Sequence, residues 1–523
     1  MNNSDIKPIT KNIYRKEVDG LRALAVLGVL INHLNSDFLK SGYLGVDIFF
    51  VISGYVITSS IINYDTKNFL KFFKNFYHRR IVRLFPNLLI FVLINSLFCL
   101  LLNPNPGGTL KTGIASLFGF SNILLSQQGI DYFSQSTKLN FFTHTWSLGI
   151  EAQFYLIFPI IFWFLFKKQN YKDYSFKRFF IFISFISSIS LILFLNFNQN
   201  DFPSTYFLLP FRFWEIGTGS LSYFIFKKIK DYKFNIPTLF SNLAFLLIFS
   251  CFTLPVRYSS FNTLLIIFLT NFLIIFVKNK SLTYKLLISY VPQKIGQISY
   301  SLYLWHWSVI SLFVWLGIDR NIFIPLILLI TILLSFLSFY KIEKNFKKKF
   351  IVIKPVISIS LSIATALISS VLIFFGYIFN NYFYISKYNP DQFQPSNKNF
   401  PCELASSLPT KNPSLCLKKN NESPHIFVLG DSIASNYIPS LQSFSKNTNY
   451  NDVLYLTSTH LLDDISDPLS KGSKAFKTLK SEIREQDIII YSQLTKNDNE
   501  VSALKEELSS LVELINTKGT KLY

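Results

Sequence analysis

The sequence predicts a polytopic α-helical membrane protein followed by a partial α/β domain. Of its 523 residues, 50% are hydrophobic and 57 are phenylalanine. The apolar residues occur in long runs, and the chain becomes polar after about residue 380. A soluble core of ordinary composition does not hold this much apolar surface. A bundle of membrane helices with a separate polar tail accounts for both parts.

Eleven apolar runs approach the roughly 20 residues that cross ~30 Å of hydrocarbon as a helix. We interpret them as about ten core membrane helices and one linking helix. A shorter stretch rich in glycine and serine, residues 113–125, is interpreted as re-entrant or interfacial. The eleven runs lie at residues 20–36, 43–62, 84–102, 142–166, 179–195, 205–226, 238–254, 261–277, 297–316, 322–340 and 355–380.

Lysines and arginines are concentrated in alternate connections between these runs, while the intervening connections carry few. By the positive-inside rule, the basic connections face the cytoplasm, which places the N-terminus inside and the tail outside. This topology and contact with anionic lipid explain the net charge of +21, so a nucleic-acid partner is not expected.

The polar tail contains short apolar strands, IFVL, VLYLT and DIIIYS, that alternate with helix-like stretches. This alternation favours an α/β domain with a parallel sheet. Cys402 and Cys416 flank a short loop before it, where an oxidising compartment permits a disulfide; two free thiols are the alternative. No Cys/His spacing indicates a metal site. We place the membrane domain at 1–350, the linking helix and extracytoplasmic linker at 351–424 and the α/β domain at 425–523.

The first apolar run carries an ionisable residue at each end, Arg22 and His33. A spacing of eleven residues gives ~16 Å of rise and places both on one helix face, which in a span usually borders the bundle interior or a wet cavity. The alternative is that Arg22 reaches lipid headgroups and His33 lies at the interface. Asp47 mirrors His33 across the following turn, so we expect its carboxylate to orient the imidazole as a general base. Arg80 and Arg83 share another helix face and suit phosphate.

Seven blocks of sequence carry a more specific signal. They are YRKEVDGLRALAVLGVLINH, GYLGVDIFFVISGYVIT, FYHRRIVRLFP, HTWSLGIEAQFYLIFP, FRFWEIGTGSLS, IGQISYSLYLWHW and FYKIEKNFKK. In this order, over roughly residues 14–350, they resemble the acyltransferase-3 family of bacterial membrane O-acyltransferases. The tail motif IFVLGDSIASNYIPSL resembles the first block of an SGNH hydrolase-like domain, which is commonly fused to this module in O-antigen acetylases.

The resemblance implies transfer of an acyl group, usually acetyl from cytoplasmic acetyl-CoA, to a hydroxyl of an envelope glycan such as lipopolysaccharide O-antigen. The location implied is the bacterial inner membrane, and acyl-CoA is a donor substrate rather than a bound cofactor. His33 would be the catalytic base, and Asp47 and Glu151 occupy acidic positions of the family. A second glutamate, common in the family, is replaced here by Ala152, so a mechanism that requires both is not expected. Three arginines would bind the donor: Arg22, Arg80 and Arg83.

Two residues in the later blocks have competing interpretations. His306, between two tryptophans, either contacts substrate or packs among aromatic rings. Ser147 is the candidate carrier if transfer proceeds through an acyl-enzyme rather than directly, and a helix-packing serine otherwise. Glu215 is expected to pair with Arg212 inside the membrane, where the pair has either a structural or a functional role.

The tail motif places Ser432 where an SGNH nucleophile would lie. Related domains supply a histidine base late in the sequence, and no histidine occupies that position before Tyr523. We therefore expect a truncated domain without a complete triad. The alternative function for the whole chain is a transporter or flippase for a lipid-linked glycan or acyl donor, because charged groups inside a helical bundle also mark translocation paths.

Overall fold

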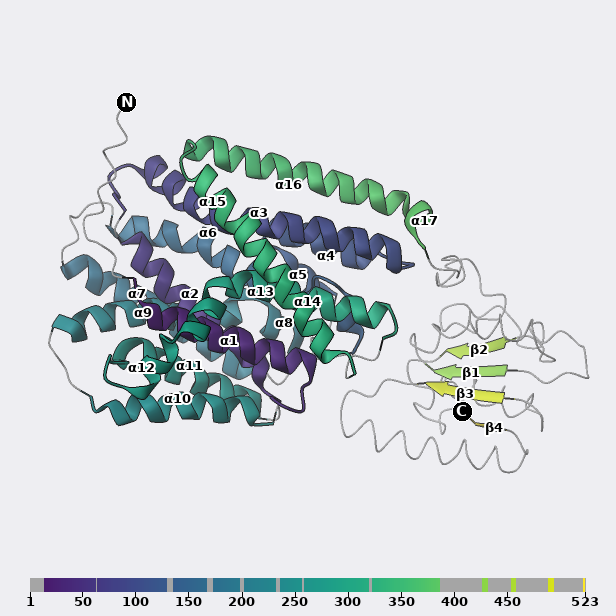
Figure 1. The fold of residues 1–523 in the computed structure, drawn as a ribbon, viewed down its shortest axis with the longest axis horizontal. Coiled ribbons are helices and arrows are strands. Elements are labelled where there is room, and N and C mark those ends of the chain that lie inside the picture. Colours follow the sequence, from purple (N-terminus) through teal and green to yellow (C-terminus); the bar gives the residue numbers. More distant parts are fainter. Residues whose placement is uncertain are drawn as a thin grey trace, which may run out of the picture. The chain divides into compact units, whose positions relative to one another are not determined.

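The structure is a computed structural model that describes most of the first 385 residues and four strands of the tail. The chain divides into two compact units, Met1–Ile385 and Ser386–Tyr523. The first unit is helical (Figure 1). The described residues are 14–62, 64–128, 135–166, 173–197, 202–231, 236–255, 258–318, 322–385, 426–430, 453–457, 488–492 and 521–522.

All eleven predicted apolar runs contain a helix. The longer helices are α1 (Lys16–Leu34), α2 (Gly45–Ile61), α3 (Phe69–Leu102), α6 (Trp146–Phe166), α7 (Asp173–Phe197), α9 (Leu209–Asp231), α10 (Thr238–Thr253), α11 (Ser259–Phe276), α13 (Tyr290–Trp315), α14 (Ile324–Leu337) and α16 (Pro355–Ile378). The shorter α-helices are α4 (Gly107–Leu117), α5 (Ser121–Gln127), α8 (Phe202–Phe207), α12 (Leu282–Leu287), α15 (Lys344–Phe350) and α17 (Asn380–Phe383). The described part of the unit also contains three 3₁₀ turns, η1 (Gly42–Leu44), η2 (Gln135–Leu139) and η3 (Thr143–Thr145), and a π-helical segment, η5 (Ser338–Glu343).

Local sequence explains where several helices begin and end. Asn68 caps α3 by accepting a hydrogen bond from the backbone N–H of Lys71 at 3.0 Å. Pro355 begins α16, at a position where its missing N–H costs nothing. The stretch 113–125, expected not to span the membrane, is divided between α4 and α5 at Gly119, whose φ of 74° is left-handed.

Seven helical segments of the described residues are long and apolar enough to cross a membrane, as expected for a multi-pass protein. Helix α1 is not among these seven segments, and its first turn carries Glu17 and Asp19. Helix α10 is apolar but shorter than a full span. The predicted number of eleven spans therefore stays a prediction. The seven segments are Gly42–Ile61, Phe69–Leu102, Thr143–Phe166, Phe176–Phe197, Ser259–Phe276, Ile324–Phe350 and Pro355–Ile378.

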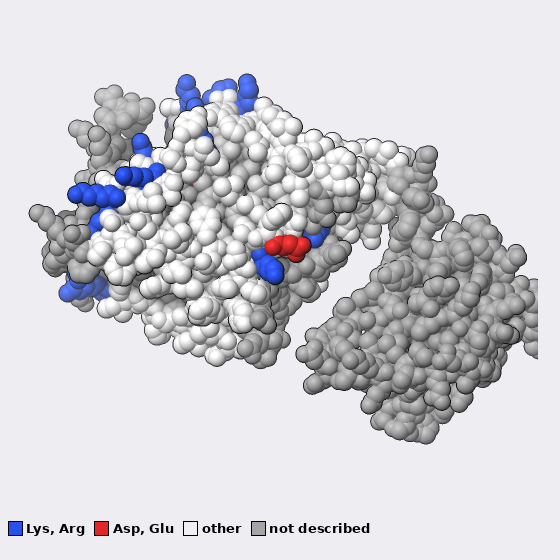
Figure 2. Space-filling view, turned by 60° about the horizontal axis from the view of Figure 1, so that its bottom comes forward, with Lys and Arg blue, Asp and Glu red and all other residues white. Residues whose placement is uncertain are grey.

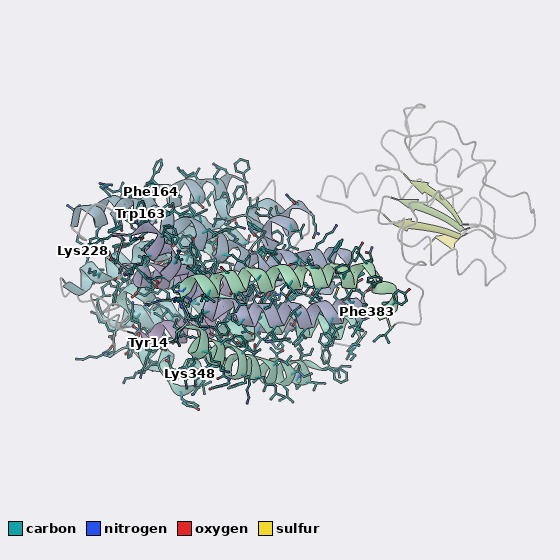
Figure 3. The ribbon with its side chains drawn as sticks, turned by 90° about the horizontal axis from the view of Figure 1, so that it is seen from above. Tyr14, Trp163, Phe164, Lys228, Lys348 and Phe383 are labelled. Carbon is teal, nitrogen blue, oxygen red and sulfur yellow. The ribbon has the colours of Figure 1, made fainter. Side chains whose placement is uncertain are left out.

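Basic side chains gather towards one end of the helical unit. Lys228 and Lys348 lie at the same end as Tyr14, whereas Phe383 lies at the opposite end (Figure 3). The face drawn in Figure 2 likewise has most of its blue side chains towards one end. This arrangement agrees with the alternation of charge predicted from the loops.

Helices α2 and α9 approach closely through two glycines. A Cβ on Gly54 would lie 1.9 Å from the carbonyl oxygen of Ile216, and a Cβ on Gly219 would lie 1.9 Å from that of Val51. Small residues permit such contact between helix backbones in membranes. The pair sets how α2 and α9 face each other, and it thereby directs the polar side chains of both helices.

Replacement of Gly219 by alanine is expected to destabilise the helical unit by about 1–3 kcal/mol, because the added methyl group must push two backbones apart. The matched control is Gly108→Ala in α4, where a Cβ would meet nothing within 4 Å. Thermal unfolding in detergent should show a lower midpoint for Gly219→Ala only. Equal midpoints for the two variants would contradict the close packing.

The second unit contains a four-stranded parallel sheet in the order β2-β1-β3-β4. Strand β1 pairs with β2 and β3, and β3 also pairs with β4, which confirms the predicted parallel sheet. Cys402, Cys416 and Ser432 lie outside the described residues, so the disulfide and the nucleophile stay predictions. The strands are β1 (Ile426–Gly430), β2 (Val453–Thr457), β3 (Ile488–Ser492) and β4 (Lys521–Leu522).

Candidate active site

A cavity in the helical unit brings together three arginines that are distant in sequence. Its lining includes Arg22 from α1, Arg80 and Arg83 from α3, and Glu151 from α6. Arg80 and Arg83 are three residues apart, so that both side chains lie on the same face of α3. The charged residues of the lining therefore contribute three guanidinium groups and one carboxylate. The cavity is therefore suited to an anion, and it unites the arginines predicted as donor-binding residues.

Each arginine is held by a different contact. Arg22 forms an ion pair with Asp19, with Nη1 2.8 Å from Oδ1. The Nε of Arg83 lies 3.8 Å from Oε1 of Glu343, a long contact for an ion pair. Arg80 donates to the hydroxyl of Ser60 at 3.1 Å, and its guanidinium lies over the ring of Tyr155 at 5.6 Å. In these contacts Arg80 is held by a hydroxyl and aromatic rings, whereas Arg22 and Arg83 face carboxylates.

Glu151 is fixed in the cavity wall by two hydroxyl groups. Ser53 donates to Oε1 at 2.6 Å, and Tyr155 donates to Oε2 at 2.9 Å. Ala152 is not part of the lining, and its methyl group lies against Gly119. The side chain of a glutamate at position 152 would leave the backbone towards the junction of α4 and α5, where the Cβ of Ala152 lies. Glu151 is therefore the carboxylate that this chain presents to the cavity.

His33 lies behind the cavity wall rather than in it. It is only 9% exposed, and its Nδ1 lies 3.0 Å from Nε2 of His306 in α13. The rings of His33 and Trp307 meet edge to face, with centroids 4.7 Å apart. His33 is absent from the cavity lining, whereas Arg22 is present. Of the two settings expected for this helix face, Arg22 borders the cavity and His33 lies in the bundle interior.

Tyr303 separates the arginine cavity from the histidines. It lines the cavity, and its ring lies 5.3 Å from that of His306. Its hydroxyl lies 2.7 Å from Oγ of Ser147 and donates to the carbonyl of His144 at 3.0 Å. Tyr303 is thus a lining residue of the cavity whose ring also contacts His306.

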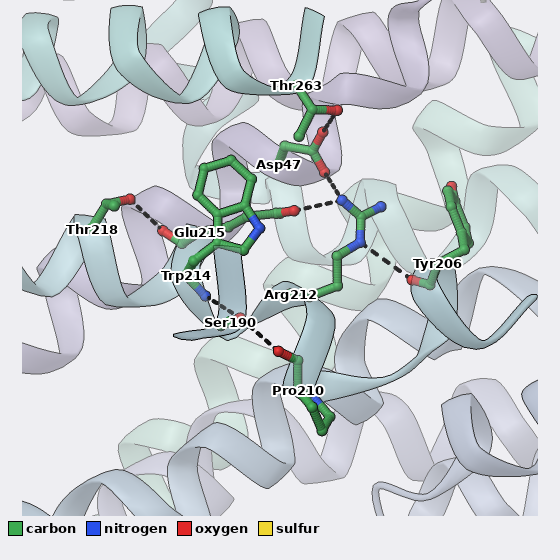
Figure 4. A network of polar contacts seen from close by, with 9 residues as sticks. All are labelled: Asp47, Ser190, Tyr206, Pro210, Arg212, Trp214, Glu215, Thr218 and Thr263. Atoms are coloured by element: carbon green, nitrogen blue, oxygen red, sulfur yellow. Dashed lines mark hydrogen bonds and ion pairs between the residues drawn. The ribbon is translucent and has the colours of Figure 1, made fainter. Parts of the chain in front are cut away.

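Asp47 does not orient His33, which corrects the sequence-based expectation. Its carboxylate lies 3.4 Å from Nη1 of Arg212 and accepts from the hydroxyl of Thr263 at 3.5 Å (Figure 4). Arg212 also pairs with Glu215 at 2.5 Å, which confirms that expected pair. Matching depth along a hairpin does not determine the direction of a side chain, and close packing of α2 on α9 directs Asp47 towards Arg212. His33 instead contacts His306 through its Nδ1.

Sequence reasoning missed the roles of two positions in the YSLYLWHW block. His306 was recognised as a substrate contact or a packing residue, but not as the partner of His33. Tyr303 received no role. The available signal was their spacing, since residues three apart on a helix share a face and would reach one neighbouring group together.

These features define a class of protein: a multi-pass membrane protein with an anion-accepting, arginine-lined cavity next to a buried histidine pair. Residues 15–340 match the family model described as an acyltransferase domain. Since the match covers more than half of the chain, the protein belongs to this acyltransferase family. The residues that line the cavity and both histidines lie within the matched range.

Two relatives from Staphylococcus aureus illustrate the family. The O-acetyltransferase OatA of strain NCTC 8325 / PS 47 is 34% identical over 375 residues, which cover 67% of this chain and 60% of OatA. The SAS0844 protein of strain MSSA476 is 34% identical over 355 residues, covering 64% of this chain and 58% of the relative. This chain thus spans less than two thirds of either relative. No solved structure matches it.

Proposed function

We propose that this protein is an integral-membrane O-acyltransferase that moves an acetyl group from acyl-CoA to a hydroxyl of an envelope glycan, such as lipopolysaccharide O-antigen. The observation that carries this proposal is the cavity lined by Arg22, Arg80, Arg83 and Tyr303, together with the His33–His306 pair, whose His306 ring contacts that of Tyr303. Arginine is the side chain best suited to phosphate because its planar fork donates two parallel hydrogen bonds. The family membership and the similarity to the O-acetyltransferase OatA support the same reaction class.

The proposed orientation follows from the distribution of charge. The basic end of the helical unit faces the cytoplasm of a bacterium, and the protein lies in its inner membrane. Arg22 is in the second turn of α1, near the end at which Tyr14 lies, whereas His33 is in the last turn. The phosphates of the donor would enter among the arginines, and the acyl group would extend along α1 towards His33. The tail, with Ser432 after β1, would then act outside the cytoplasm as an SGNH-like domain that binds or positions glycan.

The chemical step uses His33 as a general base. The imidazole accepts the proton of the glycan hydroxyl while the oxygen attacks the thioester carbonyl. The C–S bond then breaks, and the thiolate leaves with the proton returned by the imidazolium. Such base assistance contributes about 10²–10⁴ in rate. Direct transfer and transfer through Ser147 are both retained, since the Ser147 hydroxyl lies 2.7 Å from that of Tyr303 in the cavity wall.

The test of this function is acyl transfer from acetyl-CoA labelled in its acetyl group, in membranes that contain the protein. Label on the glycan, absent from membranes without the protein, supports the acyltransferase. The alternative, a transporter or flippase for the donor or a lipid-linked glycan, predicts movement of intact molecules across the membrane without label on the glycan. That second result would overturn the proposal.

Removal of one cavity arginine is expected to weaken use of acetyl-CoA but not of S-acetylpantetheine, which lacks the phosphates. Arg80→Gln should lower kcat/KM for acetyl-CoA by about 10- to 100-fold, since a charge-assisted hydrogen bond contributes about 1.5–3 kcal/mol. The matched control is Arg79→Gln, one position along α3, where the side chain is exposed and does not line the cavity. Equal losses with both donors would contradict phosphate binding by Arg80.

A further inference from the structure

The two ring nitrogens of His306 have partners of different kinds. Its Nδ1 lies 2.6 Å from the backbone carbonyl oxygen of Tyr303, and its Nε2 lies 3.0 Å from Nδ1 of His33. A carbonyl oxygen only accepts hydrogen bonds, so Nδ1 of His306 must carry a proton. The side chain is completely buried, and burial disfavours a charged ring. Neutral His306 therefore presents a lone pair at Nε2.

The arrangement of the rings agrees with a hydrogen bond rather than with stacking. The rings of His33 and His306 are within 6° of parallel, and their centroids are 5.2 Å apart. With nitrogens 3.0 Å apart, rings stacked face to face would bring the centroids much closer than this. The observed distance requires the two rings to lie nearly in line, joined by the N···N contact. Since Nε2 of His306 accepts, Nδ1 of His33 donates.

We propose that His306 is a positioning residue that holds His33 in the tautomer with its proton on Nδ1 and a lone pair on Nε2. In catalytic triads a carboxylate performs this task. Here the carboxylate first expected, Asp47, is engaged with Arg212, and a neutral imidazole replaces it. The inference rests on the proposed function, because it makes Nε2 of His33 the atom that takes the proton of the acceptor hydroxyl.

Two amide substitutions separate the two contacts of His306. Glutamine can place its carbonyl oxygen near the Nε2 position, so His306→Gln keeps an acceptor for His33. Asparagine can place its N–H near the Nδ1 position, so His306→Asn keeps only the donor to Tyr303. We expect His306→Asn to lower kcat by about 10²-fold or more, the size of general-base assistance, with KM for acetyl-CoA unchanged. His306→Gln should recover most of that loss. Equal kcat for His306→Asn and wild type would overturn the assignment.

A measurement independent of activity is the ¹⁵N spectrum of the histidine rings in the full-length protein in lipid nanodiscs. The chain has six histidines, so comparison with His33→Ala assigns the His33 signals. We expect a protonated Nδ1 and an unprotonated Nε2 for His33 in wild type and in His306→Gln, and a mixture of tautomers in His306→Asn. A proton on Nε2 in wild type would overturn the inference even if transfer is observed. The expected tautomer without any transfer would leave it intact and remove the proposed function.

Discussion

Replacement of His33 by alanine is expected to lower the rate of acyl transfer by about 10²–10⁴-fold, because the acceptor hydroxyl loses its general base. The arginines that we propose to bind the donor are untouched, so KM for acetyl-CoA should stay close to the wild-type value. Initial rates of label transfer to glycan, measured across donor concentrations and normalised to folded protein, separate the two parameters. A loss confined to kcat is the signature of an interaction made only in the transition state.

The control for this variant is another buried histidine outside the site. His78 in α3 contacts the hydroxyl of Ser358 at 2.5 Å, away from the cavity lining. We expect His78→Ala to retain transfer once the amount of folded protein is taken into account. If His33→Ala transferred acetyl as fast as wild type, His33 would not be the base.

Replacement of Arg212 by leucine is expected to have the largest effect on stability. Arg212 is 4% exposed and is the cation placed against two carboxylates, of which Asp47 is 2% and Glu215 0% exposed. Removal of one partner from a buried ion pair typically costs about 3–5 kcal/mol, since the remaining charge is left uncompensated. The yield of folded protein and its thermal midpoint in detergent should both fall sharply.

A neutralised variant distinguishes charge from packing. The triple variant Arg212→Leu, Asp47→Asn and Glu215→Gln removes both uncompensated carboxylates along with the guanidinium. We expect it to recover much of the folded protein lost in Arg212→Leu. An unchanged thermal midpoint for Arg212→Leu alone would show that the network contributes little to stability. If the triple variant were as unstable as Arg212→Leu, the loss of stability would be due to lost packing rather than to uncompensated charge.

The Asp47–Arg212–Glu215 network and the cavity arginines differ in how far their hydrogen-bonding groups are already used. Asp47 and Glu215 both pair with Arg212 across α2 and α9, and Arg212 and Asp47 make further hydrogen bonds to the carbonyl of Tyr206 and the hydroxyl of Thr263 (Figure 4). The cavity arginines have long or single contacts, which leaves donor capacity for a ligand, because each guanidinium carries five N–H groups. We therefore interpret the first set as holding helices together and the second as binding.

The sequence by itself determined the features that depend on local periodicity and composition. The apolar runs predicted the helices, the alternating short strands predicted the parallel sheet, and the three-residue spacing of Arg80 and Arg83 placed both on one face. These features follow from the pitch of a helix and the transfer of apolar side chains out of water, which operate over a few neighbouring residues. The ordered blocks also indicated the family.

Only the tertiary structure decided which polar side chains meet. His306 reaches His33 from 273 positions away, and Arg212 reaches Asp47 from 165. The rotation of each helix about its own axis selects such partners, and that rotation is set by packing against several neighbours at once, as at Gly54 and Gly219 between α2 and α9. A hydrophobic pattern reports the depth of a residue in a membrane helix, whereas the direction of its side chain depends on the shapes of all the surfaces around it.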